Sequence, residues 1–133
     1  MILGIGSDIT NISRFERSID AYGHRLIDRA LGTDEMQELN AKEFISKQEY
    51  AASVAKRFAA KEACSKALGT GFRNGIYLRD IQTVHNAKGR PELKLSGGAL
   101  KQLEKMSDKG ISLHLSISDD YPWAQAVVII EEK

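Results

Sequence analysis

The stretch KRFAAKEACSKALGTG, Lys56 to Gly71, has the alanine content of a buried helix, yet it carries Glu62 and ends on Gly-Thr-Gly. A helical wheel of about 100° per residue, with Phe58 at its origin, shows where this carboxylate points. Three small apolar residues fall within about 60° of Phe58, namely Val54, Ala51 and Ala55. Glu62 falls between the two alanines, so we expect it to project from the apolar face of a long helix over residues 46–68.

The charged neighbours of Glu62 lie elsewhere on the wheel, with Arg57 and Lys61 on one flank and Lys56 opposite. An isolated buried carboxylate is very costly, so Glu62 must be paired, hydrogen-bonded or bound to a cation. One alternative is a salt bridge to Lys66, which follows at the favourable i+4 spacing. The other is a cation site that Glu62 shares with a second carboxylate.

Asp8 is the candidate second carboxylate, because it stands at the C-terminal end of an otherwise apolar strand expected over residues 2–9. Its alternative role is to cap the helix that follows. Two hard oxygen ligands suit Mg²⁺, which keeps several waters and takes further ligands from phosphates. Lys66 and the amides of the Gly-Thr-Gly loop can cradle phosphate oxygens, although the glycine spacing is not that of a Walker A loop.

The rest of the pattern predicts an α+β fold, mainly an antiparallel sheet packed against one long helix and several short ones. We expect Asn11 or Ser13 to cap the first helix, Gly32 to close the second, and Thr33 to cap the third. The last strand is expected to be half-buried and then fully buried. The remaining expected elements are helices at 11–20, 24–32, 33–42 and 97–106, a hairpin within 78–96 that turns at 86–89, and strands at 111–118 and 123–131.

Composition narrows the class of protein. At 133 residues the chain has the length of one domain, which we place at 1–133. A net charge of +1 and 7% aromatic residues disfavour a nucleic-acid binder, which needs a basic stripe with interleaved aromatics. Cys64 is the single cysteine, so no intrachain disulfide is expected and a reducing cytoplasm fits best. No apolar run approaches a membrane span, and we recognise no signal peptide.

Two segments closely resemble the signatures of the holo-[acyl-carrier-protein] synthases, the short single-domain class of 4′-phosphopantetheinyl transferases: GIGSDI at Gly4–Ile9 and RFAAKEACSKALGTG at Arg57–Gly71. The resemblance covers essentially the whole chain and includes GRP at Gly89–Pro91. It implies transfer of 4′-phosphopantetheine from coenzyme A to a serine of apo-acyl carrier protein in fatty acid biosynthesis, with release of adenosine 3′,5′-bisphosphate. It also implies a homotrimer whose active sites are shared between neighbouring subunits.

The resemblance also assigns expected roles to individual residues. Asp8 and Glu62 match the family's Mg²⁺ ligands, and Lys66 matches a lysine close to the coenzyme A phosphates. These three are the expected catalytic residues. The residues expected to bind coenzyme A are Lys66, Gly69, Gly71, Arg90, Pro91 and His114.

The family docks its acidic carrier protein on a basic N-terminal helix, which predicts docking by Arg14, Arg17 and Arg25. Residues 1–30 contain these arginines and Arg29, but also four acidic residues, so the segment has no net charge. A basic patch therefore forms only if the arginines share a face; the alternative is a solvated surface of mixed charge.

One motif departs from the family's H-x-S-x-[ST]-H pattern, because HLSISD places Asp119 where the second histidine would be. His114 matches the first histidine, and strand alternation puts it opposite the apolar face. No role for Asp119 follows from the resemblance. The general base stays open between a metal-bound water and a carboxylate, with Asp34, Glu35 and Asp119 as candidates.

A non-catalytic module that binds coenzyme A or a carrier protein is the alternative function. Such a module would keep Arg14 and the glycine loop but should lack a pair of metal-binding carboxylates. Because Asp8 and Glu62 are both present, the sequence favours the transferase.

Overall fold

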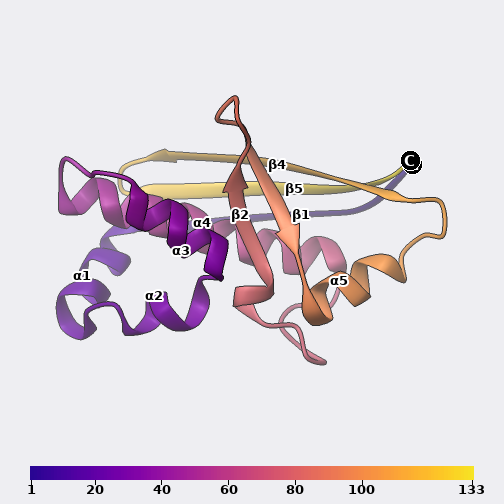
Figure 1. The fold of residues 1–133 in the computed structure, drawn as a ribbon, viewed down its shortest axis with the longest axis horizontal. Helices are drawn as coiled ribbons and strands as arrows, with labels where there is room; N and C mark the ends of the chain where they lie inside the picture. Colours follow the sequence, from indigo (N-terminus) through magenta and orange to yellow (C-terminus); the bar gives the residue numbers. More distant parts are fainter.

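The computed structural model describes residues 1–133, and it confirms the predicted α+β class, with one long helix and several short ones around antiparallel strands (Figure 1). No helix is both long enough and apolar enough to cross a membrane. The helices are α1 (Ile12–Tyr22), α2 (Arg25–Ala30), α3 (Thr33–Ala41), α4 (Lys47–Leu68), a 3-10 turn η1 (Leu78–Asp80) and α5 (Gly97–Glu104). The strands are β1 (Ile2–Asn11), β2 (Ile81–His85), β3 (Pro91–Leu95), β4 (Ile111–Asp120) and β5 (Trp123–Glu132).

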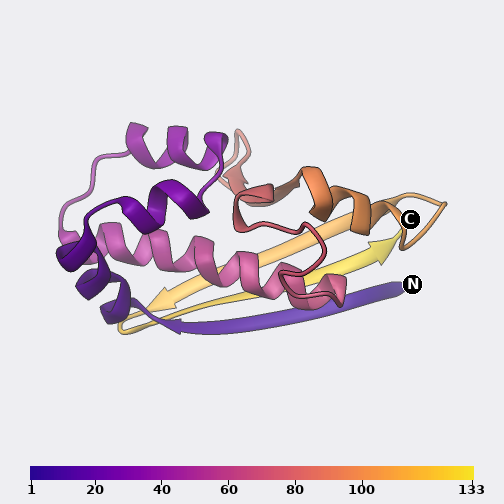
Figure 2. The same cartoon turned by 90° about the horizontal axis from the view of Figure 1, so that it is seen from below.

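The main sheet has the strand order β1-β5-β4, with both neighbouring pairs antiparallel. Helix α4 runs along one face of this sheet, and the two chain termini lie at the same end of it (Figure 2). Strands β2 and β3 form a separate antiparallel hairpin that crosses the sheet direction in Figure 1. The central strand β5 therefore places β1 and β4 at opposite edges of the main sheet.

Strand β1 and helix α4 pack backbone to backbone because two glycines face the helix. A Cβ atom on Gly6 would collide with the carbonyl oxygen of Ala63, and one on Gly4 would collide with the carbonyl oxygen of Ala67. Only glycine permits such close approach in a strand. Because side chains alternate along a strand, Asp8 projects from the same face as these glycines, toward α4.

Helix α4 begins and ends close to the predicted residues. The Ser46 hydroxyl caps it by accepting from the Glu49 N–H at 3.1 Å, and Gly69 ends it in the left-handed region with a φ of 81°. The helix is buried on nearly every side, including the charged residues Arg57 and Lys61. The helical wheel placed Arg57 and Lys61 on a flank, and it did not reveal how completely other elements surround α4.

Of the two caps predicted for α1, the structure uses Asn11, which accepts from the Ser13 N–H at 2.8 Å. The other two predicted helix ends differ in detail. Helix α2 ends at Ala30, before Gly32, and Gly32 rather than Thr33 is the residue that precedes α3. Glycine has no capping side chain, so Gln82 of β2 supplies the oxygen that accepts the first N–H groups of α3.

Strand β5 alternates along its whole length, so the expectation that its second half is fully buried is wrong for this chain. Its even-numbered residues 124–130 are buried, whereas Val127 and Ile129 are half-buried on the side away from α4. We call that side the open face of the sheet. It also carries three large apolar side chains that are at least half exposed: Ile5, Ile9 and Trp123.

Candidate functional site

Asp8 and Lys66 meet where the last turns of α4 pass β1. The Lys66 ammonium donates to the Ser7 carbonyl oxygen at 2.9 Å and lies 3.3 Å from Oδ1 of Asp8. The Lys66 side chain is half exposed, while that of Asp8 is largely covered. Solvent therefore reaches Asp8 from the side on which Lys66 lies.

Glu62 completes this cluster without an ion pair of its own. No salt bridge joins it to Lys66, so that alternative is wrong: Lys66 reaches across to Asp8 instead. Burial raises the pKa of Glu62, the nearby charge of Asp8 raises it further, and Lys66 acts in the opposite direction. The alternative role of Asp8 as a helix cap is also wrong, because Asn11 caps α1. Two carboxylates thus lie near each other, and the one lysine beside them pairs with Asp8 alone. We call Asp8, Glu62 and Lys66 the open cluster.

The glycine loop folds back onto the end of α4. The N–H of Gly69 donates to the Lys66 carbonyl at 3.0 Å, and the N–H of Gly71 donates to the Ser65 carbonyl at 3.2 Å. Both amides therefore already satisfy the helix end. A contribution of these glycines to phosphate binding would come from the space left by absent side chains rather than from their N–H groups.

A second group of predicted residues lies together in another place. Arg90, Pro91 and His114 line one groove of about 430 Å³ between β3 and β4. Nε2 of His114 lies 3.0 Å from Oε1 of Glu131. The structure thus brings three of the expected coenzyme A residues together.

These two groups lie at opposite edges of the main sheet, with Asp8 on β1 and the groove beside β4. Asp8 pairs with Ala126, which is buried against α4, so both face the helix. His114 pairs with Ile129 on the open face. Because directly paired residues project to the same side of a sheet, the side chains of Asp8 and His114 point away from each other. One chain alone does not join them into one pocket.

The docking arginines are all exposed, and two of them share a face of α1. Arg14 and Arg17 lie about 60° apart on the helical wheel, opposite the apolar residues that pack inward. Nearby acids are occupied: the Tyr121 hydroxyl donates to Glu16 at 2.6 Å, and Lys47 pairs with Asp20. Arg14 and Arg17 form no salt bridge within the chain, so both side chains are available to an acidic partner.

The three candidate general bases differ sharply in access. Glu35 is fully buried and paired with Lys61, so solvent and substrate cannot reach it. Asp34 pairs with Lys94, and Asp119 lies 3.0 Å from Lys56. The structure removes Glu35 from the candidates.

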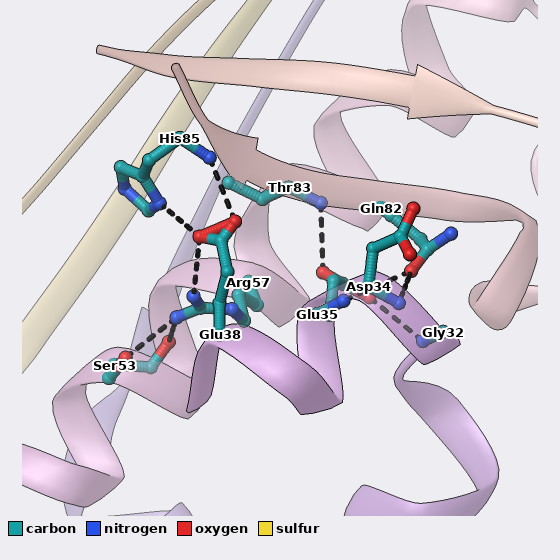
Figure 3. A network of polar contacts seen from close by, with 9 residues as sticks. All are labelled: Gly32, Asp34, Glu35, Glu38, Ser53, Arg57, Gln82, Thr83 and His85. Atoms are coloured by element: carbon teal, nitrogen blue, oxygen red, sulfur yellow. Dashed lines mark hydrogen bonds and ion pairs between the residues drawn. The ribbon is translucent and has the colours of Figure 1, made fainter. Parts of the chain in front are cut away.

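The buried pair of Glu35 and Lys61 is the site feature that the sequence analysis missed. Figure 3 shows Glu35 between Gly32 and the strand residue Thr83, beside a second network in which Glu38 meets Arg57 and His85. The available signal was the ring of small residues around α4, which indicates a helix covered on all sides. A charged residue on such a helix needs a partner wherever it points.

Comparison with known proteins defines the class that this fold and site belong to. Residues 4–126 match the model of the 4′-phosphopantetheinyl transferase superfamily. Among solved structures, the holo-[acyl-carrier-protein] synthase of Neisseria meningitidis aligns with a TM-score of 0.79 at 37% identity, covering 98% of this chain and 99% of that one. The enzyme of Bacillus anthracis in complex with CoA (3′,5′-ADP) aligns with a TM-score of 0.75 at 32% identity, covering 100% and 99%.

Curated relatives narrow this class. Holo-[acyl-carrier-protein] synthases of Phenylobacterium zucineum and Brucella ovis are each 47% identical over 98% of this chain, which covers 93% and 96% of them. The chain therefore belongs to the holo-[acyl-carrier-protein] synthases within the 4′-phosphopantetheinyl transferase superfamily. The resemblance read from its two signatures is confirmed, and so is its assignment as an enzyme.

Proposed function

We propose that this chain transfers 4′-phosphopantetheine from coenzyme A to a serine of apo-acyl carrier protein in the cytoplasm, as a step of fatty acid biosynthesis. The serine oxygen attacks the β-phosphorus in line, the bond to the bridging oxygen breaks, and adenosine 3′,5′-bisphosphate leaves. Family membership supports the reaction, and the open cluster supports its location.

The observation that carries the proposal is the meeting of Asp8 and Glu62 from two separate rigid elements. Burial and the nearby charge of Asp8 raise the pKa of Glu62, and the Lys66 ammonium pairs with Asp8 alone. Two carboxylates placed this way have the donor chemistry of a Mg²⁺ site that leaves room for waters and phosphate oxygens. Asp8 and Glu62 would hold the ion, which when bound neutralises charge on the pyrophosphate.

The chain's own residues supply the remaining electrostatics. Lys66 is half exposed at the rim, so its ammonium can turn from Asp8 toward the pyrophosphate oxygens and stabilise charge there. Arg90, Pro91 and His114 would hold the nucleotide end of coenzyme A in their groove. Glu35 cannot accept the serine proton, which leaves Asp34, Asp119 or a bound water for that role.

A complete site then requires a second subunit. The open cluster lies at the β1 edge of the sheet and the coenzyme A groove at the β4 edge, so the groove of one chain would serve the cluster of its neighbour. The open face exposes Ile5, Ile9 and Trp123, apolar area that a neighbouring subunit would cover. We propose a closed ring of three chains, with the acidic carrier protein docked on Arg14, Arg17 and Arg25.

The decisive test is mass spectrometry of an apo-acyl carrier protein incubated with this protein, coenzyme A and Mg²⁺. A gain of one phosphopantetheine group is expected, and no gain when the magnesium is chelated. Tight binding of coenzyme A or carrier protein with no mass gain would instead favour the non-catalytic binding module.

Assembly is tested by mixing two inactive variants. Subunits with Asp8→Ala and subunits with His114→Ala should regain part of the activity when they are unfolded together and refolded, because some interfaces then combine an intact cluster with an intact groove. Sedimentation that shows a fully active monomer at assay concentration would end the shared-site proposal.

A further inference from the structure

The most deeply buried charges of the molecule form a second lysine–carboxylate pair, Glu35 with Lys61, which we call the closed pair. Both side chains have 0% exposure. The Lys61 ammonium lies 2.5 Å from Oε1 of Glu35 and donates to the carbonyl oxygens of Leu78 at 2.9 Å and Ile81 at 2.5 Å. The closed pair therefore links α4 to α3, to η1 and to the start of β2.

Both oxygens of Glu35 and all three N–H groups of Lys61 are hydrogen-bonded within the protein. The three N–H groups of Lys61 donate to three acceptors. Besides Lys61, Glu35 accepts from the Gly32 N–H at 3.1 Å and from the Thr83 N–H at 2.9 Å (Figure 3). Because both side chains are also fully buried, neither a substrate nor a metal ion can reach them. A buried ion pair returns little or no net stability compared with an apolar pair of similar size. The contribution of the closed pair is then to the relative placement of the elements that it links.

That geometry bears directly on the open cluster, because Lys61 and Glu62 are consecutive residues of α4. Gly4 and Gly6 fix how closely β1 approaches one side of the helix, and contacts on the other sides must fix its rotation. At a side-chain radius of roughly 5–6 Å, a turn of about 20° would move the Glu62 carboxylate by roughly 2 Å. Lys61 is bonded at its tip to three fixed acceptors on the far side of the helix, which opposes such a turn.

We propose that Glu35 and Lys61 are positioning residues, which fix the rotation of α4 and so hold the Glu62 carboxylate opposite Asp8. The inference rests on the proposed function, in which these two carboxylates bind the metal ion. The proposed role of the closed pair is in metal affinity, and it is separate from any contribution of the pair to stability.

The test measures Mn²⁺ binding by electron paramagnetic resonance on the folded protein without coenzyme A, alongside KM for Mg²⁺ in the transfer assay. Mn²⁺ is the probe because its oxygen-ligand chemistry resembles that of Mg²⁺. The variant Glu35→Gln/Lys61→Met removes both buried charges together. We expect its Mn²⁺ affinity to fall about tenfold, the range seen when groups that orient metal ligands are removed, with KM for Mg²⁺ rising more than kcat falls.

Val54→Ala is the matched control, because the Val54 side chain is fully buried in α4 but packs only by apolar contacts and makes no hydrogen bond to another element. It should lower thermal stability while Mn²⁺ affinity stays within twofold of the wild type. Glu35→Gln alone keeps the two carbonyl contacts of Lys61 and should lose affinity by about threefold, a usable measurement if the double variant does not fold.

The outcomes separate this inference from the proposed function. Unchanged Mn²⁺ affinity in both closed-pair variants would overturn the positioning role, and so would an equal loss in Val54→Ala. If the Asp8→Ala variant bound Mn²⁺ as tightly as the wild type, the proposed metal site would be overturned, and the positioning role with it.

Discussion

Helix α4 carries two lysine–carboxylate groupings that begin one residue apart and differ in almost every physical respect. The closed pair of Lys61 and Glu35 is fully buried, and both oxygens of Glu35 and all three N–H groups of Lys61 are hydrogen-bonded. The open cluster of Asp8, Glu62 and Lys66 is partly exposed, and Glu62 has no cation of its own. The comparison teaches that buried charges bonded to groups inside the protein serve its structure. Partly exposed charges without a full set of partners can still bind a ligand.

The largest expected effect lies in the open cluster. Asp8→Ala or Glu62→Ala should abolish transfer, lowering kcat/KM roughly a thousandfold, because a bound metal contributes several kcal/mol to charge stabilisation. The fold should survive, as judged by circular dichroism, because neither carboxylate satisfies a buried partner. Glu104→Ala, which removes an exposed carboxylate from α5, is the matched control. Full activity with magnesium still required would remove both residues from the metal site.

The second effect sharpens the comparison through stability. Lys61→Met should lower the free energy of unfolding by about 3–5 kcal/mol in urea titrations, because it leaves the Glu35 carboxylate buried without a counter-charge. Lys66→Met should change it by less than about 1 kcal/mol, as expected for a pair whose lysine is half exposed. Equal losses of unfolding free energy from the two substitutions would contradict the distinction between the closed pair and the open cluster.

A smaller effect is expected outside both groupings, on α1. Arg14→Glu should raise KM for the carrier protein by roughly tenfold while KM for coenzyme A changes little, because charge complementarity acts at docking. Rising salt should mimic the substitution by screening exposed charges. Lys101→Glu on α5 makes the same charge change on another exposed helix and should have little effect. Equal loss for both substrates would place Arg14 in the nucleotide site instead.

The smallest effect concerns Cys64, which lies three residues beyond Lys61 and is fully buried. Burial raises its pKa to about 12, so almost no thiolate exists at pH 8. We expect no labelling of the native protein by a thiol-specific disulfide reagent at that pH, and full labelling once the protein is unfolded in urea. Rapid labelling of the folded protein would show that the packing around Cys64 and the neighbouring Lys61 opens readily.

Much of the fold was predictable because its signals are local. The α4 boundaries follow from a serine cap and a closing glycine, and the last two strands follow from alternation and composition. The cap of α3 was not predictable, because its oxygen comes from Gln82, which is distant in sequence. The burial pattern of β5 was misread because an apolar run does not reveal whether a second layer covers it.

The sequence by itself determined the α+β class, the family and the candidate metal ligands, because strand alternation, helical periodicity and the spacing around Asp8 and Glu62 are properties of neighbouring residues. Only the tertiary structure decided which lysine meets which carboxylate. Lys66 lies at the favourable spacing from Glu62 but bonds Asp8, and Lys61 lies on a predicted flank but is fully buried with Glu35. The physical reason is that an ion pair forms with the charge that folding brings within reach, and distant segments of the chain supply that charge.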